Sequence, residues 1–141
     1  MLPDSLQHKK IGIFGYGVNN AALVAWLVTH GAEDVVIYDQ SEAVRDRVAG
    51  QNLDVRVETG DEAFERATDR DVIFRTPGMH VDHTALVAAR ERAAKVTSQT
   101  DLFLELCPAR MVGVTGTKGK GTVASLLHNI LEVRSTKYEV R

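Results

Sequence analysis

Short runs of β-branched residues alternate with helical patterns through most of the chain, and this alternation restricts the fold more than any other feature. The runs lie at 11–14, 35–38, 55–57 and 72–74. Helices are predicted between and after them at about 18–30, 41–50, 61–69 and 82–95, with Gly31 and Gly50 at the ends of the first two. The pattern predicts βαβ units and therefore an α/β fold: a Rossmann-like parallel sheet with helices on both faces.

The pattern changes after Lys95. A short strand at Val96 and a brief segment at 101–106 lead to the break Cys107-Pro108. A new strand is predicted at Met111–Val114, followed by a second glycine-rich turn. The helix after it carries one apolar stripe, formed by Val123, Leu126, Leu127, Ile130 and Leu131. We therefore predict a first domain at 1–95 and, at 96–141, the first strand, glycine loop and helix of a second α/β domain.

Composition excludes several classes of function. The 141 residues carry a formal charge of −2, which gives no field that favours nucleic acid or an anionic membrane. The longest apolar run, 21–28, is far shorter than the roughly 20 residues that cross a bilayer. Residues 1–10 are mostly polar, with no long apolar stretch behind them, so we expect no secretory signal and a cytoplasmic location. His80 and His83 lack a third ligand at usable spacing, and a G-x-S-x-G nucleophile turn is absent from the sequence.

The first glycine-rich turn, Gly15-Tyr16-Gly17-Val18-Asn19-Asn20, follows the first predicted strand and opens the first predicted helix. Gly15 permits a tight turn, and Gly17 lets a phosphate approach the backbone at the start of the helix. Asn20 stands where a dinucleotide-binding turn has its third glycine. The turn predicts a nucleotide site, and a purely structural turn is the alternative.

Two further features lie at the same carboxyl edge of the predicted sheet. Asp39 ends the second strand, where an acidic side chain often binds a nucleotide's ribose or base. The alternative is that Asp39 caps the helix beginning near Ser41. Thr76-Pro77-Gly78 closes the fourth strand, either at the ligand site or as an ordinary turn.

The second glycine-rich turn lies between the last predicted strand and helix. Its residues are Gly116, Thr117, Lys118, Gly119, Lys120, Gly121 and Thr122. Backbone N–H groups in such a loop surround the phosphates of ATP, and we predict that Lys120 reaches the β and γ phosphates while the Thr122 hydroxyl holds Mg²⁺. The spacing differs from G-x-x-x-x-G-K-[ST], because Gly121 separates the lysine from the hydroxyl. A structural loop is the alternative.

Two such turns in this order, with 113–117 reading Gly-Val-Thr-Gly-Thr before Gly119-Lys120, resemble the Mur ligases of peptidoglycan synthesis. Within this family, the chain is most similar to the members that add D-glutamate to UDP-N-acetylmuramoyl-L-alanine. Three features select them: the first turn, Asp39, and the sequence Thr-Pro-Gly-Met at 76–79, which is similar to their S-P-G-I. The resemblance spans about 8–131. These members often have serine at the position of Gly121. A glycine there makes the loop similar to that of folylpolyglutamate synthases, but those enzymes lack a preceding nucleotide-binding domain.

The resemblance implies roles for individual residues. The uridine nucleotide positions are Gly15, Gly17, Val18, Asn19, Asp39, Gln40 and Gly78. The loop 116–122 would bind ATP, with Lys120 as the catalytic residue and Thr122 on Mg²⁺. The chemistry would transfer the ATP γ-phosphate to the substrate carboxylate, and the D-glutamate amine would attack the resulting acyl phosphate.

The resemblance also implies that the chain is the N-terminal part of such an enzyme, ending just after the helix of its ATP loop. By itself the chain is therefore expected to be inactive and to self-associate through its apolar stripe. A nucleotide-binding Rossmann regulatory module without catalysis is the competing interpretation. The second glycine-rich turn discriminates between them, since such a module has no use for it.

Overall fold

The computed structural model describes residues 2–137, with side chains described up to residue 133. It divides after Leu106 into two compact units. The first unit contains every strand described in the chain, and the second contains one helix, α5 (Lys120–Lys137). No helix in the described range is long and apolar enough to cross a membrane.

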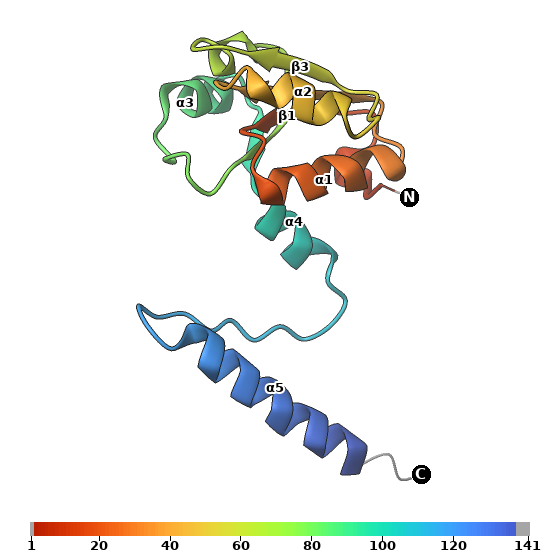
Figure 1. Ribbon diagram of the computed structural model, residues 1–141, viewed down its shortest axis with the longest axis vertical. Coiled ribbons are helices and arrows are strands. Elements are labelled where there is room, and N and C mark those ends of the chain that lie inside the picture. Colours follow the sequence, from red (N-terminus) through yellow and green to blue (C-terminus); the bar gives the residue numbers. More distant parts are fainter. Residues whose placement is uncertain (1, 138–141) are drawn as a thin grey trace. The chain divides into compact units, whose positions relative to one another are not determined.

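The first unit is built on a five-stranded parallel sheet (Figure 1). Its strands are β1 (Lys10–Phe14), β2 (Asp34–Asp39), β3 (Arg56–Thr59), β4 (Val72–Arg75) and β5 (Lys95–Thr97). The order across the sheet is β3-β2-β1-β4-β5. The α-helices of this unit are α1 (Val18–Thr29), α2 (Ala43–Ala49), α3 (Thr84–Glu91) and α4 (Gln99–Leu106), and two 3₁₀ turns are η1 (Asp4–Leu6) and η2 (Phe64–Arg66). The predicted α/β class is confirmed.

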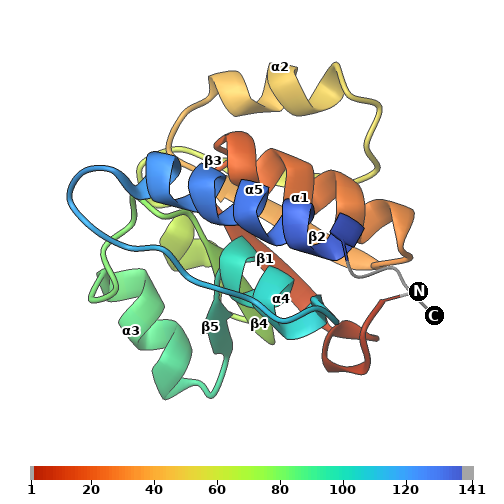
Figure 2. The same ribbon diagram turned by 90° about the horizontal axis from the view of Figure 1, so that it is seen from below.

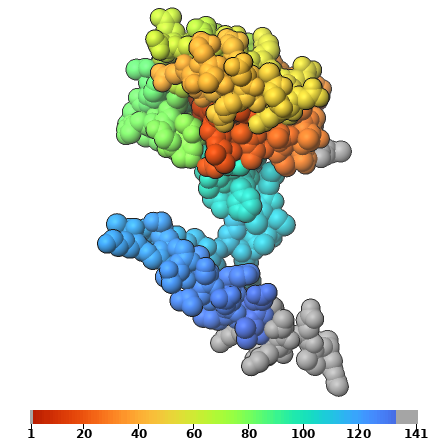
Figure 3. Space-filling view, viewed as in Figure 1, coloured from red at the N-terminus to blue at the C-terminus, as the bar shows by residue number. Residues whose placement is uncertain are grey.

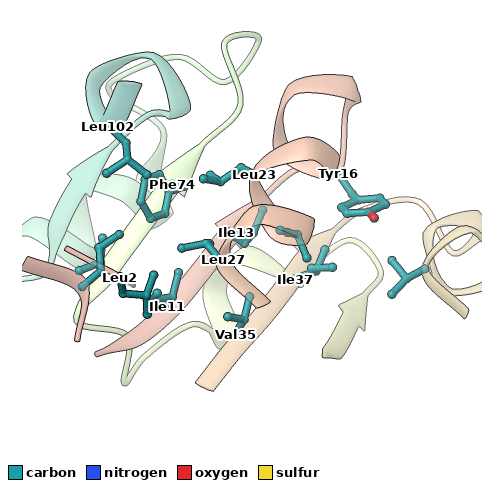
Figure 4. Packing of buried hydrophobic residues seen from close by; sticks show 14 of the residues in the cluster. Leu2, Ile11, Ile13, Tyr16, Leu23, Leu27, Val35, Ile37, Phe74 and Leu102 are labelled. Atoms are coloured by element: carbon teal, nitrogen blue, oxygen red, sulfur yellow. The ribbon is translucent and has the colours of Figure 1, made fainter. Parts of the chain in front are cut away.

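Helices cover both faces of this sheet, as Figure 2 shows. On one face α1, α2 and α4 bury a core that includes Ile13, Leu27, Ile37 and Leu102 (Figure 4). The side chains of α1 and α2 form a continuous outer surface there (Figure 3). On the other face η2 and α3 pack against Phe14, Val36 and Ile73. Strands covered on both faces need apolar side chains in both directions, which explains the continuous apolar runs of β1 and β2.

The strand order places a topological switch point between β1 and β4. The connection from β1 leads to β2 on one side, whereas β4 leads to β5 on the other. In an open α/β sheet the crevice outside the carboxyl ends at such a point is where ligands bind. The first glycine-rich turn follows β1 at this crevice, and the Thr76-Pro77-Gly78 turn follows β4.

Two helix predictions differ from the structure. The predicted helix at 61–69 is only the single turn η2. This connection crosses β2 and β1 to reach β4, and an α-helix advances only about 1.5 Å per residue. The predicted helix at 82–95 ends at Glu91. Ala93, at φ +64°, occupies the left-handed position that ends many helices and that glycine would have signalled.

The predicted strand at Met111–Val114 is not formed in the structure. A strand needs a neighbour for its backbone groups, and residues 107–137 contain no other strand that could pair with it. The first unit also extends beyond residue 95, the predicted end of the first domain. The reason is that β5 pairs with β4 and that Leu102 of α4 is buried in the core of the sheet.

Candidate functional site

Gly15 lies so close to the Thr76 side chain that any residue with a Cβ would be strained at this position. Its φ is +81°, and a Cβ added to it would lie 2.9 Å from Cγ2 of Thr76. The Gly15 N–H donates to the Tyr38 carbonyl at 2.8 Å, and the Thr76 N–H donates to the Phe14 carbonyl at 2.9 Å. The first glycine-rich turn and the turn after β4 are therefore packed directly against each other at the switch point.

Asn20 replaces the third glycine of a dinucleotide-binding turn with a buried carboxamide, 1% exposed. Its Nδ2 donates to the Gly15 carbonyl at 2.8 Å and to the Phe14 carbonyl at 3.3 Å. The side chain thus occupies the space that a glycine would leave between helix and strand. It also fixes the shape of the turn.

The start of α1 offers backbone donors to a ligand. Its N-cap is Gly17, which has no side chain to accept a hydrogen bond from the first N–H groups of the helix. The first N–H groups of a helix have no acceptor within it, and the helix dipole makes this end attractive to anions. Val18 and Asn19, two of the predicted nucleotide positions, are exposed here.

Asp39 joins the end of β2 to the first glycine-rich turn. Its Oδ2 accepts the Tyr16 N–H at 2.6 Å, and its Oδ1 accepts the Ser41 N–H at 2.9 Å. It does not cap α2, because that helix begins at Ala43 with Glu42 as its N-cap. The carboxylate lies at the predicted edge and organises the backbone of both loops.

The remaining predicted nucleotide positions, Gln40 and Gly78, are exposed in the loops after β2 and β4. No atom lies within 4 Å of a Cβ added to Gly78. The Met79 N–H closes the turn on the Thr76 carbonyl at 3.1 Å. The carboxyl edge of the sheet therefore brings together the glycine-rich turn, Asp39 and the turn after β4.

Tyr16, the middle residue of the G-x-G turn, makes contacts that the sequence did not predict. Its ring is 1% exposed, and its hydroxyl donates to Oε1 of Gln51 at 2.7 Å. Burial raises the pKa of this phenol, and the nearby Arg47 guanidinium, 5.3 Å from the ring centre, partly opposes that rise. Tyr16 thus ties the turn to α2, and no spacing in the sequence signals this pairing.

The second glycine-rich turn lies in the second unit, at the start of α5. Gly116 has a φ of +151° and Gly119 a φ of +78°. The Lys120 Nζ donates back to the Gly116 carbonyl at 2.6 Å, and Thr122 lies in the first turn of the helix. The predicted loop residues 116–122 are all exposed. Within the described residues, no group of three or more His, Cys, Asp or Glu side chains is placed to hold a metal ion.

Comparison with known proteins identifies relatives of this chain. The chain is 33% identical over 136 residues to the UDP-N-acetylmuramoylalanine–D-glutamate ligase of Clostridium novyi (strain NT), a match that covers 95% of this chain and 30% of that protein. The enzyme of the same name from Clostridium kluyveri (strain ATCC 8527) is 36% identical over 133 residues, covering 92% and 29%. This chain is homologous to Mur ligases. The resemblance predicted from its two glycine-rich turns is confirmed.

A solved Mur ligase shares the fold. The crystal structure of UDP-N-acetylmuramate-alanine ligase MurC from Thermotoga maritima matches with a TM-score of 0.56 at 20% identity, covering 70% of this chain and 22% of that one. No protein-family model matches the chain. The chain spans about 30% of the length of the curated relatives that it matches.

Proposed function

We propose that this Mur ligase homologue takes part in the ATP-dependent addition of D-glutamate to UDP-N-acetylmuramoyl-L-alanine, a cytoplasmic step of peptidoglycan synthesis. The observation that carries the proposal is the meeting of the first glycine-rich turn, Asp39 and the turn after β4 at the switch point. The names of the similar ligases support the choice of reaction.

The first unit would bind the uridine nucleotide. The uncapped start of α1 and the exposed Gly17 offer backbone N–H groups to a phosphate. Asn20 fills the place of the third glycine, which argues against a dinucleotide bound in the usual way. The exposed residues Val18, Asn19, Gln40 and Gly78 border the same edge.

The loop 116–122 fits ATP and Mg²⁺ by its backbone and its donors. Positive φ at Gly116 and Gly119 shapes the loop, and the first N–H groups of α5 lack helical acceptors. The bond from Lys120 to Gly116 shows that the ammonium group reaches back over the loop. Lys120 would bind the phosphates and Thr122 would hold Mg²⁺.

When bound, ATP would supply the γ-phosphoryl group that activates the substrate carboxylate, with ADP leaving, and Mg²⁺ would offset negative charge on the phosphates. The contribution of this chain is electrostatic. Lys120 and the loop N–H groups would offset negative charge on the phosphates and hold them in position. The first unit would orient the carboxylate by holding the nucleotide at the other end of the substrate.

Calorimetric titration of the 141-residue chain with UDP and with NADH tests the nucleotide site. We expect UDP to bind and NADH to bind more weakly or not at all. Tighter binding of NADH would overturn the proposal and favour a regulatory module that holds a dinucleotide. Absence of UDP binding would remove the nucleotide site from the first unit.

A further inference from the structure

The face of the sheet that carries η2 and α3 is hollowed over β2 and β3. Phe64 of η2 packs over β1, with its ring centre 5.0 Å from that of Phe14. The connection from β3 to β4 holds only this single turn, so it leaves the outer part of the face without a covering helix. A cavity of about 570 Å³ lies there, which we call the β2–β3 hollow. Ligand pockets measure roughly 300–1,000 Å³, so the hollow has room for a small ligand.

Tyr38, on β2, lines the hollow with a buried ring and an unpaired hydroxyl. The residue is 4% exposed, and its ring lies in the core of this face of the sheet. The hydroxyl has no hydrogen-bond partner among the described residues, and it is not one of the fully enclosed polar atoms. The charged side chains that act on it all line the hollow; they are Arg56, Glu58, Asp69 and Arg70. The hydroxyl therefore opens into the hollow.

This hydroxyl is suited to an uncharged polar group of a ligand. Burial raises the pKa of Tyr38, so the phenol keeps its proton at neutral pH. A protonated phenol donates one hydrogen bond and also accepts. A ligand that displaces water from the hollow must replace these bonds, because a buried polar group without a partner costs free energy. An amide offers both a carbonyl and an N–H for this purpose.

The rest of the lining carries both signs of charge in equal number. Three arginines and three carboxylates line the hollow: Arg56, Arg66, Arg70, Glu58, Glu65 and Asp69. Several already form pairs, such as Arg66 with Glu58 at 3.5 Å and Arg70 with Asp69 at 2.8 Å. A polyanion such as a nucleotide would meet the carboxylates, and a polycation would meet the guanidinium groups. The lining therefore favours a ligand that carries one charge of each sign.

Two of these side chains keep capacity for a ligand. Glu65 is exposed on η2 and makes no ion pair or hydrogen bond with any described residue. Arg56 makes one long contact, 3.4 Å from Nη2 to Oδ1 of Asp34, and has further N–H groups. Arg70 differs, because all three of its nitrogens already bond Asp34 or Asp69. A ligand ammonium therefore fits Glu65, and a ligand carboxylate fits Arg56.

We propose that the β2–β3 hollow binds a short peptide with free ends, its carboxylate on Arg56, its ammonium on Glu65 and its amide at the Tyr38 hydroxyl. The inference goes beyond the proposed function. The hollow shares no residue with the first glycine-rich turn, with Asp39 or with the turn after β4, where the nucleotide is proposed to bind. The two sites can therefore be tested separately on the same chain.

Glycylglycine is the probe, titrated into the ¹⁵N-labelled 141-residue chain and followed by NMR. We expect saturable shifts of amide signals in β2, β3 and η2, with a millimolar dissociation constant. N-acetylglycylglycine lacks the ammonium, and glycylglycinamide lacks the carboxylate. Glycine lacks the internal amide. Each of the three should bind at least fivefold more weakly than glycylglycine.

Variants assign the individual contacts. Glu65→Gln should abolish the preference for glycylglycine over N-acetylglycylglycine, and Arg56→Gln should abolish the preference over glycylglycinamide. Tyr38→Phe keeps the ring in the core, so it should preserve the urea unfolding midpoint while weakening glycylglycine about threefold to tenfold. Glu62→Gln is the matched control, because Glu62 is an exposed carboxylate of the same connection that does not line the hollow. It should leave all affinities unchanged.

The outcomes decide the proposal without touching the nucleotide site. Absence of saturable shifts at tens of millimolar glycylglycine would overturn it. Shifts confined to 15–20 and 76–79 would move the dipeptide to the carboxyl edge and overturn it as well. So would equal binding of the capped derivatives, or unchanged affinity in Tyr38→Phe. Titration with UDP tests the proposed function independently, because a failure of glycylglycine to bind leaves the expected UDP binding intact.

Discussion

The carboxylate of Asp39 accepts the backbone N–H of Tyr16 at 2.6 Å and thereby fixes the first glycine-rich turn to the end of β2. Its second oxygen accepts the Ser41 N–H. An acidic residue at this place in a nucleotide-binding fold is usually assigned to the ligand. Here both oxygens already bind backbone donors, so a loss of affinity on mutation has two sources that must be separated.

Replacing Asp39 separates these sources. Asp39→Asn keeps one good acceptor, whereas Asp39→Ala removes both, and each charge-assisted bond is worth about 1.5–3 kcal/mol. We expect urea unfolding to show a smaller loss of stability for Asp39→Asn than for Asp39→Ala. Both variants should also bind UDP more weakly at temperatures where they are folded. Normal UDP affinity in folded Asp39→Ala would leave Asp39 with a structural role alone.

Gly15 and Gly17 should respond differently to the same substitution. Gly15→Ala introduces a left-handed alanine and a contact with Thr76, and we expect a loss of about 2–4 kcal/mol of stability. Gly17 has a φ of −77°, and its nearest neighbour to an added Cβ is 3.8 Å away. Gly17→Ala should therefore keep wild-type stability but weaken UDP binding, since the methyl group blocks the phosphate.

Double substitution checks the cause. Thr76→Ser deletes the Cγ2 atom that an added Cβ on Gly15 would meet, so it should restore part of the stability lost in Gly15→Ala. Additive losses in the double variant would show that the contact with Cγ2 of Thr76 does not cause the effect. A Gly17→Ala variant with unchanged UDP affinity would contradict a phosphate at that turn.

Periodicity predicted the parts of the fold that depend on local pattern and burial. The core strands β1 and β2 and the helix α1 lie within about one residue of their predicted ranges, because uninterrupted apolar runs and Gly31 define them. The predicted helices differ from the structure where tertiary geometry determines their length. The crossover to β4 has room for η2 only, and Ala93 ends α3 without the glycine that would have signalled it.

The glycine-rich turn and the acidic residue of the candidate site could be predicted from the sequence, but the contacts between its loops could not. Glycines at 15 and 17 and Asp39 are recognisable because their positions relative to a strand end are fixed by chain geometry. Gly15 and Thr76 come from segments far apart in the sequence, and only the β1–β4 pairing brings them into contact. Single-sequence patterns do not encode such long-range neighbours.

Arg70 should dominate the stability of the opposite edge of the sheet. Its side chain is 3% exposed and bonds Asp34 at 2.7 Å and Asp69 at 2.8 Å. Arg70→Met should cost about 2–4 kcal/mol at pH 7, because two carboxylates lose their buried partner. Arg56→Met is the control: Arg56 also pairs with Asp34, but it is 69% exposed and should contribute less than about 1 kcal/mol.

The pH dependence follows from Asp69. Its hydrogen bond to Arg70 holds the pKa of this carboxyl below the ordinary value. A lowered folded-state pKa adds stability above the unfolded pKa of about 4, and this stability is lost as pH falls through the folded value. The difference between wild type and Arg70→Met should therefore shrink below about pH 4. A difference that stays constant down to pH 2.5 would show that Arg70 acts by packing alone.

Lys120 should be required for contact with ATP. In ¹⁵N-edited NMR spectra of the 141-residue chain, we expect MgATP at millimolar concentration to shift the amide signals of residues 116–122. Lys120→Ala should abolish these shifts, since the ammonium group carries the phosphate contact. Arg110→Ala removes an exposed positive charge from the same unit and should leave them in place. Equal shifts in Lys120→Ala would make the loop lysine structural.

The last prediction is that the 141-residue chain forms no ADP in the presence of D-glutamate and UDP-N-acetylmuramoyl-L-alanine. Phosphoryl transfer needs an acidic side chain that helps to hold Mg²⁺ as well as the loop. Within residues 107–137 the structure provides α5 but no strand to carry such a residue. Val123, Leu126, Ile130 and Leu131 on α5 are each more than half exposed. Burying them against a second copy would lower the free energy, so we expect sedimentation to show association that rises with concentration. D-glutamate-dependent ADP formation by the purified chain would refute this prediction, because it would require a complete ATP site.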